Sequence, residues 1–181
     1  MAGPSPSTSL WLSRALFVSL ALFSMLISMM PLGLTADALP MPDLVFALAF
    51  AWVIRSPSTA PLVLVAITAL LADVLLMRPL GLWALVMIIA TEFARAQRIP
   101  LRAQVLVVEW VIFAIAMALG LGLNGIILST TFTPRPGFDL MLNFWLISVA
   151  AYPVVCAMLY WVFRIRAPLV SATSDRLGRV I

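Results

Sequence analysis

The segment of residues 42–96 constrains the fold more than any other part of the sequence. It holds three apolar runs separated by prolines and arginines, and one acid, Asp73, lies inside the second run. Over the whole chain 64% of the residues are hydrophobic and only 10% are charged, which leaves too few polar side chains to cover a soluble globule of 181 residues. The sequence therefore predicts an all-α integral membrane protein.

Six apolar stretches are candidates for transmembrane helices, because about 20 apolar residues cross roughly 30 Å of hydrocarbon. They are residues 10–30, 44–54, 61–77, 80–96, 101–123 and 140–163. The second is too short to cross alone at about 1.5 Å per residue, so we expect it to include residues 41–43 or to lie among longer helices. We predict one six-helix domain, residues 10–166, with cytoplasmic tails at 1–9 and 167–181.

The first stretch has an alternative interpretation as a secretory signal peptide. Arg14 precedes an apolar core, and the sequence Ala-Asp-Ala at 36–38 has the form of a cleavage site. A single arginine is a weak positive region, so we favour a transmembrane helix.

Arginines and tryptophans predict how the chain is oriented. With six spans, nine of the eleven arginines fall on one side and only Arg78 and Arg135 on the other. Because cytoplasmic loops carry an excess of positive charge, this predicts that both termini lie in the cytoplasm. Tryptophan favours membrane interfaces, and five tryptophans lie near predicted span ends: Trp11, Trp52, Trp83, Trp145 and Trp161.

Asp73 is a candidate site because a charge inside hydrocarbon is rarely tolerated without a partner. It lies about one helical turn before Met77 at the end of the third span. It could accept hydrogen bonds from Arg78, from the first N–H groups of the fourth helix, or from another span. The favoured role is to fix the turn between the third and fourth helices, and the alternative is substrate or ion binding.

Glu92 and Glu109 lie on either side of the tip of a predicted cytoplasmic hairpin at residues 99–100, seven residues before it and nine after it, so we expect them at about equal depth. Ion pairs with Arg95 and Arg102 near the interface are the favoured use of these acids. A proton or cation site shared by the two carboxylates is the alternative.

Pro153 is the one proline in the middle of a predicted span. It should kink the sixth helix and free carbonyl groups one turn earlier. Those carbonyls need another partner in lipid, so we expect the kink to face a neighbouring helix.

Small residues predict where helices approach closely, because membrane helices associate through close packing. The fifth span carries one stripe of small residues, and the second span carries a shorter pair. These are Ala114, Ala118 and Gly122, with Ala116 and Gly120 beside them, and Ala47 with Ala51. The alternative is that alanine merely fills an apolar helix.

The sequence argues against an enzyme. It has no histidine, and its lone cysteine, Cys156, lies within an apolar run. There is no HExxH motif, no phosphate-binding loop before a helix, and a single intramembrane aspartate where an aspartyl dyad needs two. We predict no catalytic residue, metal, cofactor or nucleic-acid partner.

Several segments together resemble the bacterial rod shape-determining protein MreD family. In chain order they are Pro42-Asp43, Trp52-Val53-Ile54-Arg55-Ser56-Pro57, Asp73, Pro79-Leu80-Gly81-Leu82, Tyr152-Pro153 and the basic residues Arg164 and Arg166. Asp43 and Gly81 thus join Asp73, Glu92, Glu109 and Pro153 as structural or functional candidates. The chain departs from the family at Ala69, where a glycine is frequent.

The resemblance implies a fold, a location and partners. The fold would be a six-helix bundle similar to the substrate-binding subunits of vitamin transporters, in the bacterial inner membrane. The chain would be a non-catalytic scaffold that binds MreC within the wall-elongation complex, with indirect links to a transpeptidase and a glycosyltransferase. The alternative is a vitamin-binding transporter subunit, whose first helix carries an Ala-x-x-x-Ala pair where this chain has Ala15 and Ser19.

The exterior loop predicted at residues 124–139 is a candidate partner surface. It holds Phe132, Arg135 and Phe138, and aromatic residues and arginine are enriched among the residues that dominate binding energy. The alternative is a connector stiffened by its prolines.

Overall fold

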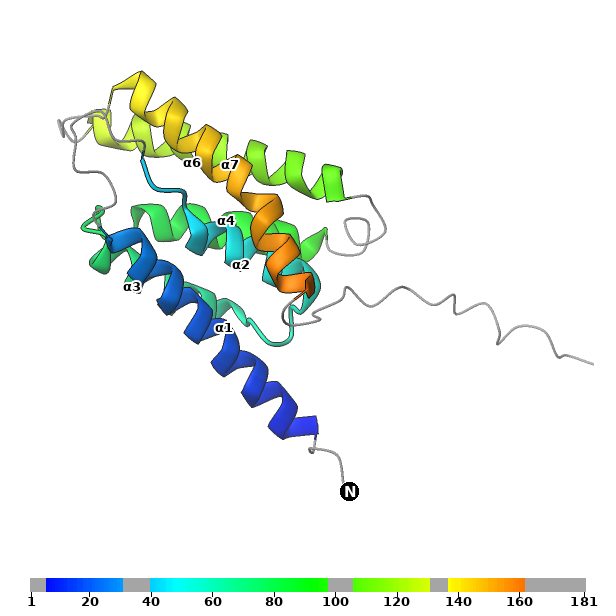
Figure 1. The fold of residues 1–181 in the computed structure, drawn as a ribbon. Helices are drawn as coiled ribbons and strands as arrows, with labels where there is room; N and C mark the ends of the chain where they lie inside the picture. The colour runs from blue at the N-terminus through cyan, green and yellow to red at the C-terminus, as the bar shows by residue number, and fades with distance from the viewer. Residues whose placement is uncertain (1–5, 31–39, 98–105, 131–136, 162–181) are drawn as a thin grey trace, which may run out of the picture.

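The computed structural model describes residues 6–30, 40–97, 106–130 and 137–161 (Figure 1). This part of the chain is all-α, as predicted. Its helices are α1 (Pro6–Met29), α2 (Leu44–Arg55), α3 (Leu62–Leu75), α4 (Leu82–Ala96), α6 (Leu106–Thr130) and α7 (Phe138–Trp161). Three of them are long and apolar enough to cross a membrane, namely α1 from Leu10 onward, α6 and α7, while α2 and α3 are shorter apolar helices.

The helix α2 forms the centre of the fold. Ten consecutive residues, 45–54, are buried, and α2 contacts α1, α3, α4 and α7. In Figure 1, α2 and α4 lie between α6 and α7 on one side and α1 and α3 on the other. The expectation that this short helix lies among other helices is therefore confirmed.

Aromatic side chains fill the space between α2, α6 and α7. Phe113 on α6 stacks on Tyr152 of α7 with ring centroids 4.3 Å apart, and its ring lies 5.4 Å from Phe46 and 5.5 Å from Phe50. All four side chains are completely buried. Offset and edge-on aromatic pairs of this kind each add about 0.5 to 1.5 kcal/mol beyond the burial of their area.

The helix α6 runs seven residues further than predicted. The fifth span was expected to end at Leu123, before Asn124 and Gly125, but α6 continues to Thr130. In an apolar environment, backbone groups that leave a helix lose their hydrogen bonds, so a lone asparagine and glycine do not end it. The predicted loop 124–139 was therefore wrong in its bounds, since its first seven residues and its last two are helical.

Two of the tryptophans predicted near span ends are buried within the described fold. Trp52 is fully buried and donates to Thr59 Oγ1 at 2.8 Å, and Trp83 is 5% exposed. Their position at interfacial depth stays a prediction, because burial inside the fold does not fix depth in a membrane. Their indole N–H groups have partners inside the fold, which makes burial of the ring favourable.

The small residues predicted to mark close contacts divide into two groups. Ala47 and Ala51 are fully buried on α2, as expected. On α6 the close approach occurs at Gly120, where an added Cβ would collide with Val86 of α4. Ala118 and Gly122 are instead exposed, so this part of the stripe faces away from the other described helices.

Candidate functional site

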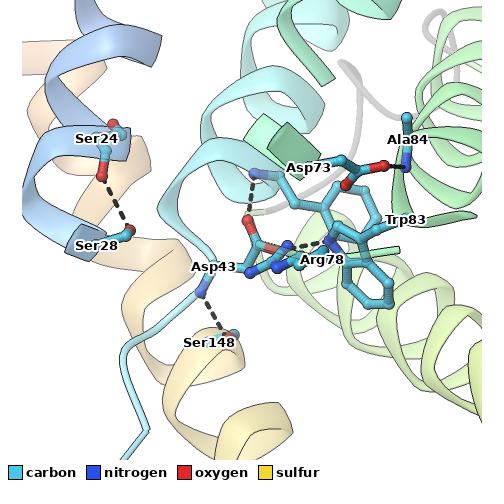
Figure 2. A network of polar contacts seen from close by, with 9 residues as sticks. Ser24, Ser28, Asp43, Asp73, Arg78, Trp83, Ala84 and Ser148 are labelled. Carbon is cyan, nitrogen blue, oxygen red and sulfur yellow. Dashed lines mark hydrogen bonds and ion pairs between the residues drawn. The ribbon is translucent and has the colours of Figure 1, made fainter. Parts of the chain in front are cut away.

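A cluster of polar side chains surrounds the start of α2 (Figure 2). We call Asp43, Arg78, Trp83 and Ser148 the α2 N-terminal cluster. The carboxylate of Asp43 is 3% exposed, and its Oδ1 accepts from Phe46 N at 2.9 Å, which caps the helix. Its Oδ2 accepts from Arg78 Nη1 at 2.8 Å and from Trp83 Nε1 at 2.6 Å, while its backbone N donates to Ser148 Oγ at 2.9 Å.

This cluster ties four parts of the fold together through one side chain. Asp43 precedes α2, Arg78 lies in the α3–α4 turn, Trp83 lies in the first turn of α4 and Ser148 lies on α7. The guanidinium of Arg78 also lies over two rings, 5.5 Å from Trp83 and 5.8 Å from Phe144. The carboxylate of Asp43 and the rings of Trp83 and Phe144 together hold the guanidinium in place.

Asp73 caps the helix that follows it. It is fully buried, and its Oδ2 accepts from Gly81 N at 2.9 Å and from Ala84 N at 3.1 Å (Figure 2). The expected bonds to the first N–H groups of the fourth helix are therefore present. The side chain of Arg78 instead binds Asp43, and only its backbone N donates to Asp73 O, at 2.9 Å.

Gly81 needs to be glycine because of its backbone conformation. Its φ of 83° lies in the left-handed region, although an added Cβ would meet no atom within 4 Å. It occupies the N-cap position of α4 and has no side chain to bind the helix N–H groups. Asp73 supplies that acceptor from α3, so the two residues together form the turn between α3 and α4.

A second polar cluster lies at the other end of α2. We call Arg55, Glu109, Tyr152 and Cys156 the α2 C-terminal cluster. Arg55 Nη1 donates to Glu109 Oε1 at 2.6 Å, and both side chains are largely buried, at 11% and 8% exposure. The hydroxyl of Tyr152 donates to the same Glu109 oxygen, and Cys156 Sγ lies 3.8 Å from it.

The local positions of these two charges favour their pairing. Arg55 lies in the last turn of α2 and Glu109 in the first turn of α6, where each charge opposes the partial charge of its own helix end. The pair joins two helices whose charged residues are 54 positions apart in sequence. Arg55 also donates to Ala51 O at 2.9 Å, which fixes its direction.

The predicted arginine partner is confirmed for Glu92, and the partner predicted for Glu109 is not tested. Glu92 pairs with Arg95 at 2.9 Å, as expected, and Arg95 also donates to Pro57 O and Ala60 O. Glu109 binds Arg55, whereas Arg102, the partner expected from sequence, lies outside the described residues. The two acids thus have separate arginine partners on different helices.

The proline in α7 frees a carbonyl that a neighbouring helix binds. Pro153 lies inside α7 and cannot donate to Val149 O, four residues earlier. Trp110 Nε1 of α6 donates to that oxygen at 2.7 Å. The expectation that a neighbouring helix would supply the partner is confirmed.

A pocket of about 410 Å³ opens beside Arg78 at the α2 N-terminal end of the bundle. Residues from both sides of the α6–α7 connection line it, together with the α3–α4 turn. We call it the Arg78 pocket, and its lining residues are Pro40, Met77, Arg78, Pro79, Trp83, Leu121, Asn124, Gly125, Leu128, Leu140, Met141 and Phe144.

No metal centre is present among the described residues, in which no group of three or more His, Cys, Asp or Glu side chains could hold an ion. The acids and arginines of the two clusters instead bind one another or backbone groups.

Comparison with known protein families agrees with the resemblance read from the sequence. The family model for the rod shape-determining protein MreD matches residues 7–165. The chain belongs to the MreD family. The comparisons with curated proteins and with solved structures each gave no match.

Membership in the MreD family indicates a membrane protein with a role in the determination of rod shape. The matched region includes all the described helices except the first residue of α1. It contains both polar clusters and the Arg78 pocket.

Sequence reasoning assigned no polar partner to five members of the two clusters: Arg55, Trp83, Ser148, Tyr152 and Cys156. Arg55 and Tyr152 appeared within the segments that resemble the family, Arg55 also as a marker of the cytoplasmic side, and Trp83 only as a residue near a span end. The signal for Arg55 lay in the predicted topology, which already placed it and Glu109 on the same side of the membrane.

Of the partner-loop candidates, Phe138 begins α7 with 77% exposure, while Phe132 and Arg135 lie outside the described residues.

Proposed function

We propose that this protein is a non-catalytic membrane scaffold of the bacterial wall-elongation machinery that binds the transmembrane helix of an MreC-like partner. Asp43, Glu92 and Glu109 each bind an arginine of the same chain, which supports a structural use of these acids. Links to the elongation transpeptidase and glycosyltransferase would be indirect, through that partner.

An apolar groove between α4 and α6 is the observation that carries this proposal. It has a volume of about 440 Å³. We call it the α4–α6 groove, and it is lined by Val86, Ile89, Ala90, Phe93, Ile112, Ile115, Ala116, Leu119, Gly120 and Leu123.

The shape of this groove suits a transmembrane helix. Ala90 and Gly120 are buried at its floor, while Ile89, Ile115 and Leu119 are 55%, 54% and 69% exposed along it. Small residues between bulky ones allow a second helix to approach closely, and in a membrane such packing drives association. A single transmembrane helix is therefore the occupant that we propose.

The connection between α6 and α7 would provide a second contact on the exterior side. Phe138 is strongly exposed at the start of α7, two residues before Leu140, which lines the Arg78 pocket. Phe132 and Arg135 precede it in the sequence. Aromatic and arginine side chains in such a position favour binding to a segment of the partner outside the membrane.

A bulky residue in the α4–α6 groove tests the proposal. We expect Ala116→Trp to reduce co-purification of the MreC homologue by about 5- to 30-fold, because it removes a packed helix contact of about 1 to 2 kcal/mol. The matched control is Ala118→Trp, two residues further along α6 on an exposed face outside the groove. Equal retention of the partner by both variants would contradict the docking site.

The combined replacement of Phe132, Arg135 and Phe138 by serine should weaken co-purification of the partner without lowering the amount of this protein in the membrane.

Purified protein from the same preparations should be searched for a bound small molecule by mass spectrometry. A stoichiometric small molecule, together with normal partner binding in every variant, would favour the vitamin-binding subunit. The six-helix fold of those subunits stays a prediction for this chain.

Both termini are proposed to lie in the cytoplasm, on the strength of the arginine distribution. In a Cys156→Ala background, single cysteines at Ser58 and Gln97 should be shielded from an impermeant thiol reagent in intact cells. A cysteine at Thr133 should be labelled. Labelling at Gln97 would exclude the six-span orientation.

A further inference from the structure

A second groove lies between α1 and α3, on the opposite side of α2 from α6 and α7. Its volume is about 530 Å³, and none of the described acids lines it. We call it the α1–α3 groove, and it is lined by Trp11, Arg14, Ala15, Val18, Ser19, Pro61, Val63, Leu64 and Ile67.

Arg14 is the charged residue of this groove. Its Nε atom is buried and has no hydrogen-bond partner among the described residues. The guanidinium lies 5.3 Å from the centre of the Trp11 ring, which holds it against α1. An arginine that is oriented by an aromatic ring, with an N–H group left unbonded, lacks an acceptor that an anion would supply.

The start of α3 adds to the positive potential at the same end of the groove. Pro61 occupies the N-cap position and makes no side-chain bond to the first turn. The first N–H groups of a helix have no partner within it and carry a partial positive charge. Arg14 and the start of α3 line the same groove, so both favour an anion there.

The rest of the groove is apolar. Val18 lies one turn beyond Arg14 on α1, and Ile67 lies two turns along α3 from Pro61. Val63 and Ile67 are 63% and 59% exposed, so the groove is open on its outer side, where lipid surrounds a membrane protein. A molecule that fills it needs an anionic group at one end and a hydrocarbon chain along the remainder.

We propose that the α1–α3 groove binds one anionic phospholipid. Its phosphate would accept from the guanidinium of Arg14 and lie near the first turn of α3, and one acyl chain would lie along Val18 and Ile67. Arginine presents planar N–H groups that suit phosphate oxygens, and basic pockets between membrane helices on the cytoplasmic side bind anionic headgroups. A free phosphate would leave the apolar wall uncovered, so a lipid is the occupant.

Native mass spectrometry of the full chain, released from detergent, can measure this binding. The probes are phosphatidylglycerol and phosphatidylcholine with identical acyl chains, and glycerol 3-phosphate as the soluble headgroup. We expect phosphatidylglycerol to bind about fivefold more tightly than phosphatidylcholine, the effect of one arginine on an anionic lipid. Glycerol 3-phosphate should not compete at equal concentration.

Three variants separate the headgroup contact from the acyl contact. Arg14→Gln should abolish the fivefold preference for phosphatidylglycerol while general lipid adducts remain, and Arg14→Lys should keep part of that preference because it keeps the charge. Ile67→Trp should reduce adducts of both lipids, since it fills the apolar part of the groove. The matched control is Leu12→Gln, which changes a 72% exposed residue of α1 outside the groove and should have no effect.

An unchanged preference for phosphatidylglycerol in Arg14→Gln would overturn the proposal. Displacement of the lipid by glycerol 3-phosphate would overturn it as well, because it would identify a free-anion site. If Arg14→Gln does not yield folded protein, the wild-type chain and Ile67→Trp still decide the question. Lipid adducts that Ile67→Trp leaves unchanged would then exclude this groove.

Discussion

Replacement of Glu109 by leucine is expected to lower the free energy of unfolding in detergent by about 3 to 5 kcal/mol. The variant would leave the buried guanidinium of Arg55 without its carboxylate and the hydroxyl of Tyr152 without its acceptor. A buried charge that has lost its partner keeps the full cost of its desolvation. In a thermal unfolding measurement the midpoint should fall by at least about 6 °C for a chain of this size.

The double variant Arg55→Leu with Glu109→Leu distinguishes pairing from simple loss of a side chain. Removing both charges leaves no unpaired ion, so we expect most of the lost stability to return. Of the groups that bind Glu109, the hydroxyl of Tyr152 would stay unbonded, at a cost of about 1 to 3 kcal/mol, and the weak thiol contact of Cys156 would be lost. A double variant as unstable as Glu109→Leu alone would show that the ion pair is not what stabilises this end of α2.

Replacement of Asp43 by leucine should have the next largest effect, a loss of about 3 kcal/mol. One side chain caps α2 and binds both Arg78 and Trp83, so its removal leaves three donors without an acceptor. Asp43→Asn should lie between the wild type and Asp43→Leu. The amide oxygen can still cap Phe46 N, but the amide nitrogen cannot accept from Arg78 or Trp83.

Ser148→Ala provides the matched control for Asp43. It removes one neutral hydrogen bond to the backbone N of Asp43 and leaves the carboxylate contacts in place. We expect a loss of about 1 kcal/mol in the same thermal measurement. The role assigned to the Asp43 carboxylate would be wrong if Asp43→Leu were no less stable than Ser148→Ala.

Contacts between residues that are near in sequence were well predicted. Asp73 and the first turn of α4 are separated by a short turn, so the bonds to Gly81 and Ala84 could be anticipated from helix capping alone. The Glu92–Arg95 pair lies on adjacent turns of one helix, and the partner of the carbonyl freed by Pro153 followed from the absence of water in lipid.

The partners that were missed are distant in sequence. Arg55 and Glu109 are 54 residues apart, and Asp43 and Ser148 are 105 residues apart. Hydropathy assigns a residue to a span and a depth, but it does not say which helices are neighbours. The order in which membrane helices pack depends on close shape complementarity, such as that between Gly120 and Val86, which a single sequence does not reveal.

The end of α6 was predicted wrongly for a different reason. Asn124 and Gly125 are strong turn signals in water, where a broken helix can bond to solvent. Within an apolar helix the same residues leave no alternative partner for the backbone, so the helical bonds persist.

The short length of α3 and α4 has a consequence for a surrounding bilayer. These helices have 14 and 15 residues, which corresponds to about 21 to 23 Å, whereas α6 with 25 residues extends for about 37 Å. If α3 and α4 cross the membrane as proposed, a bilayer with a hydrocarbon core of about 30 Å would meet a thin edge and a thick edge on the same molecule. Elastic compression and stretching of acyl chains cost fractions of a kcal/mol per Å of mismatch, so the lipids around the protein would then be deformed unequally.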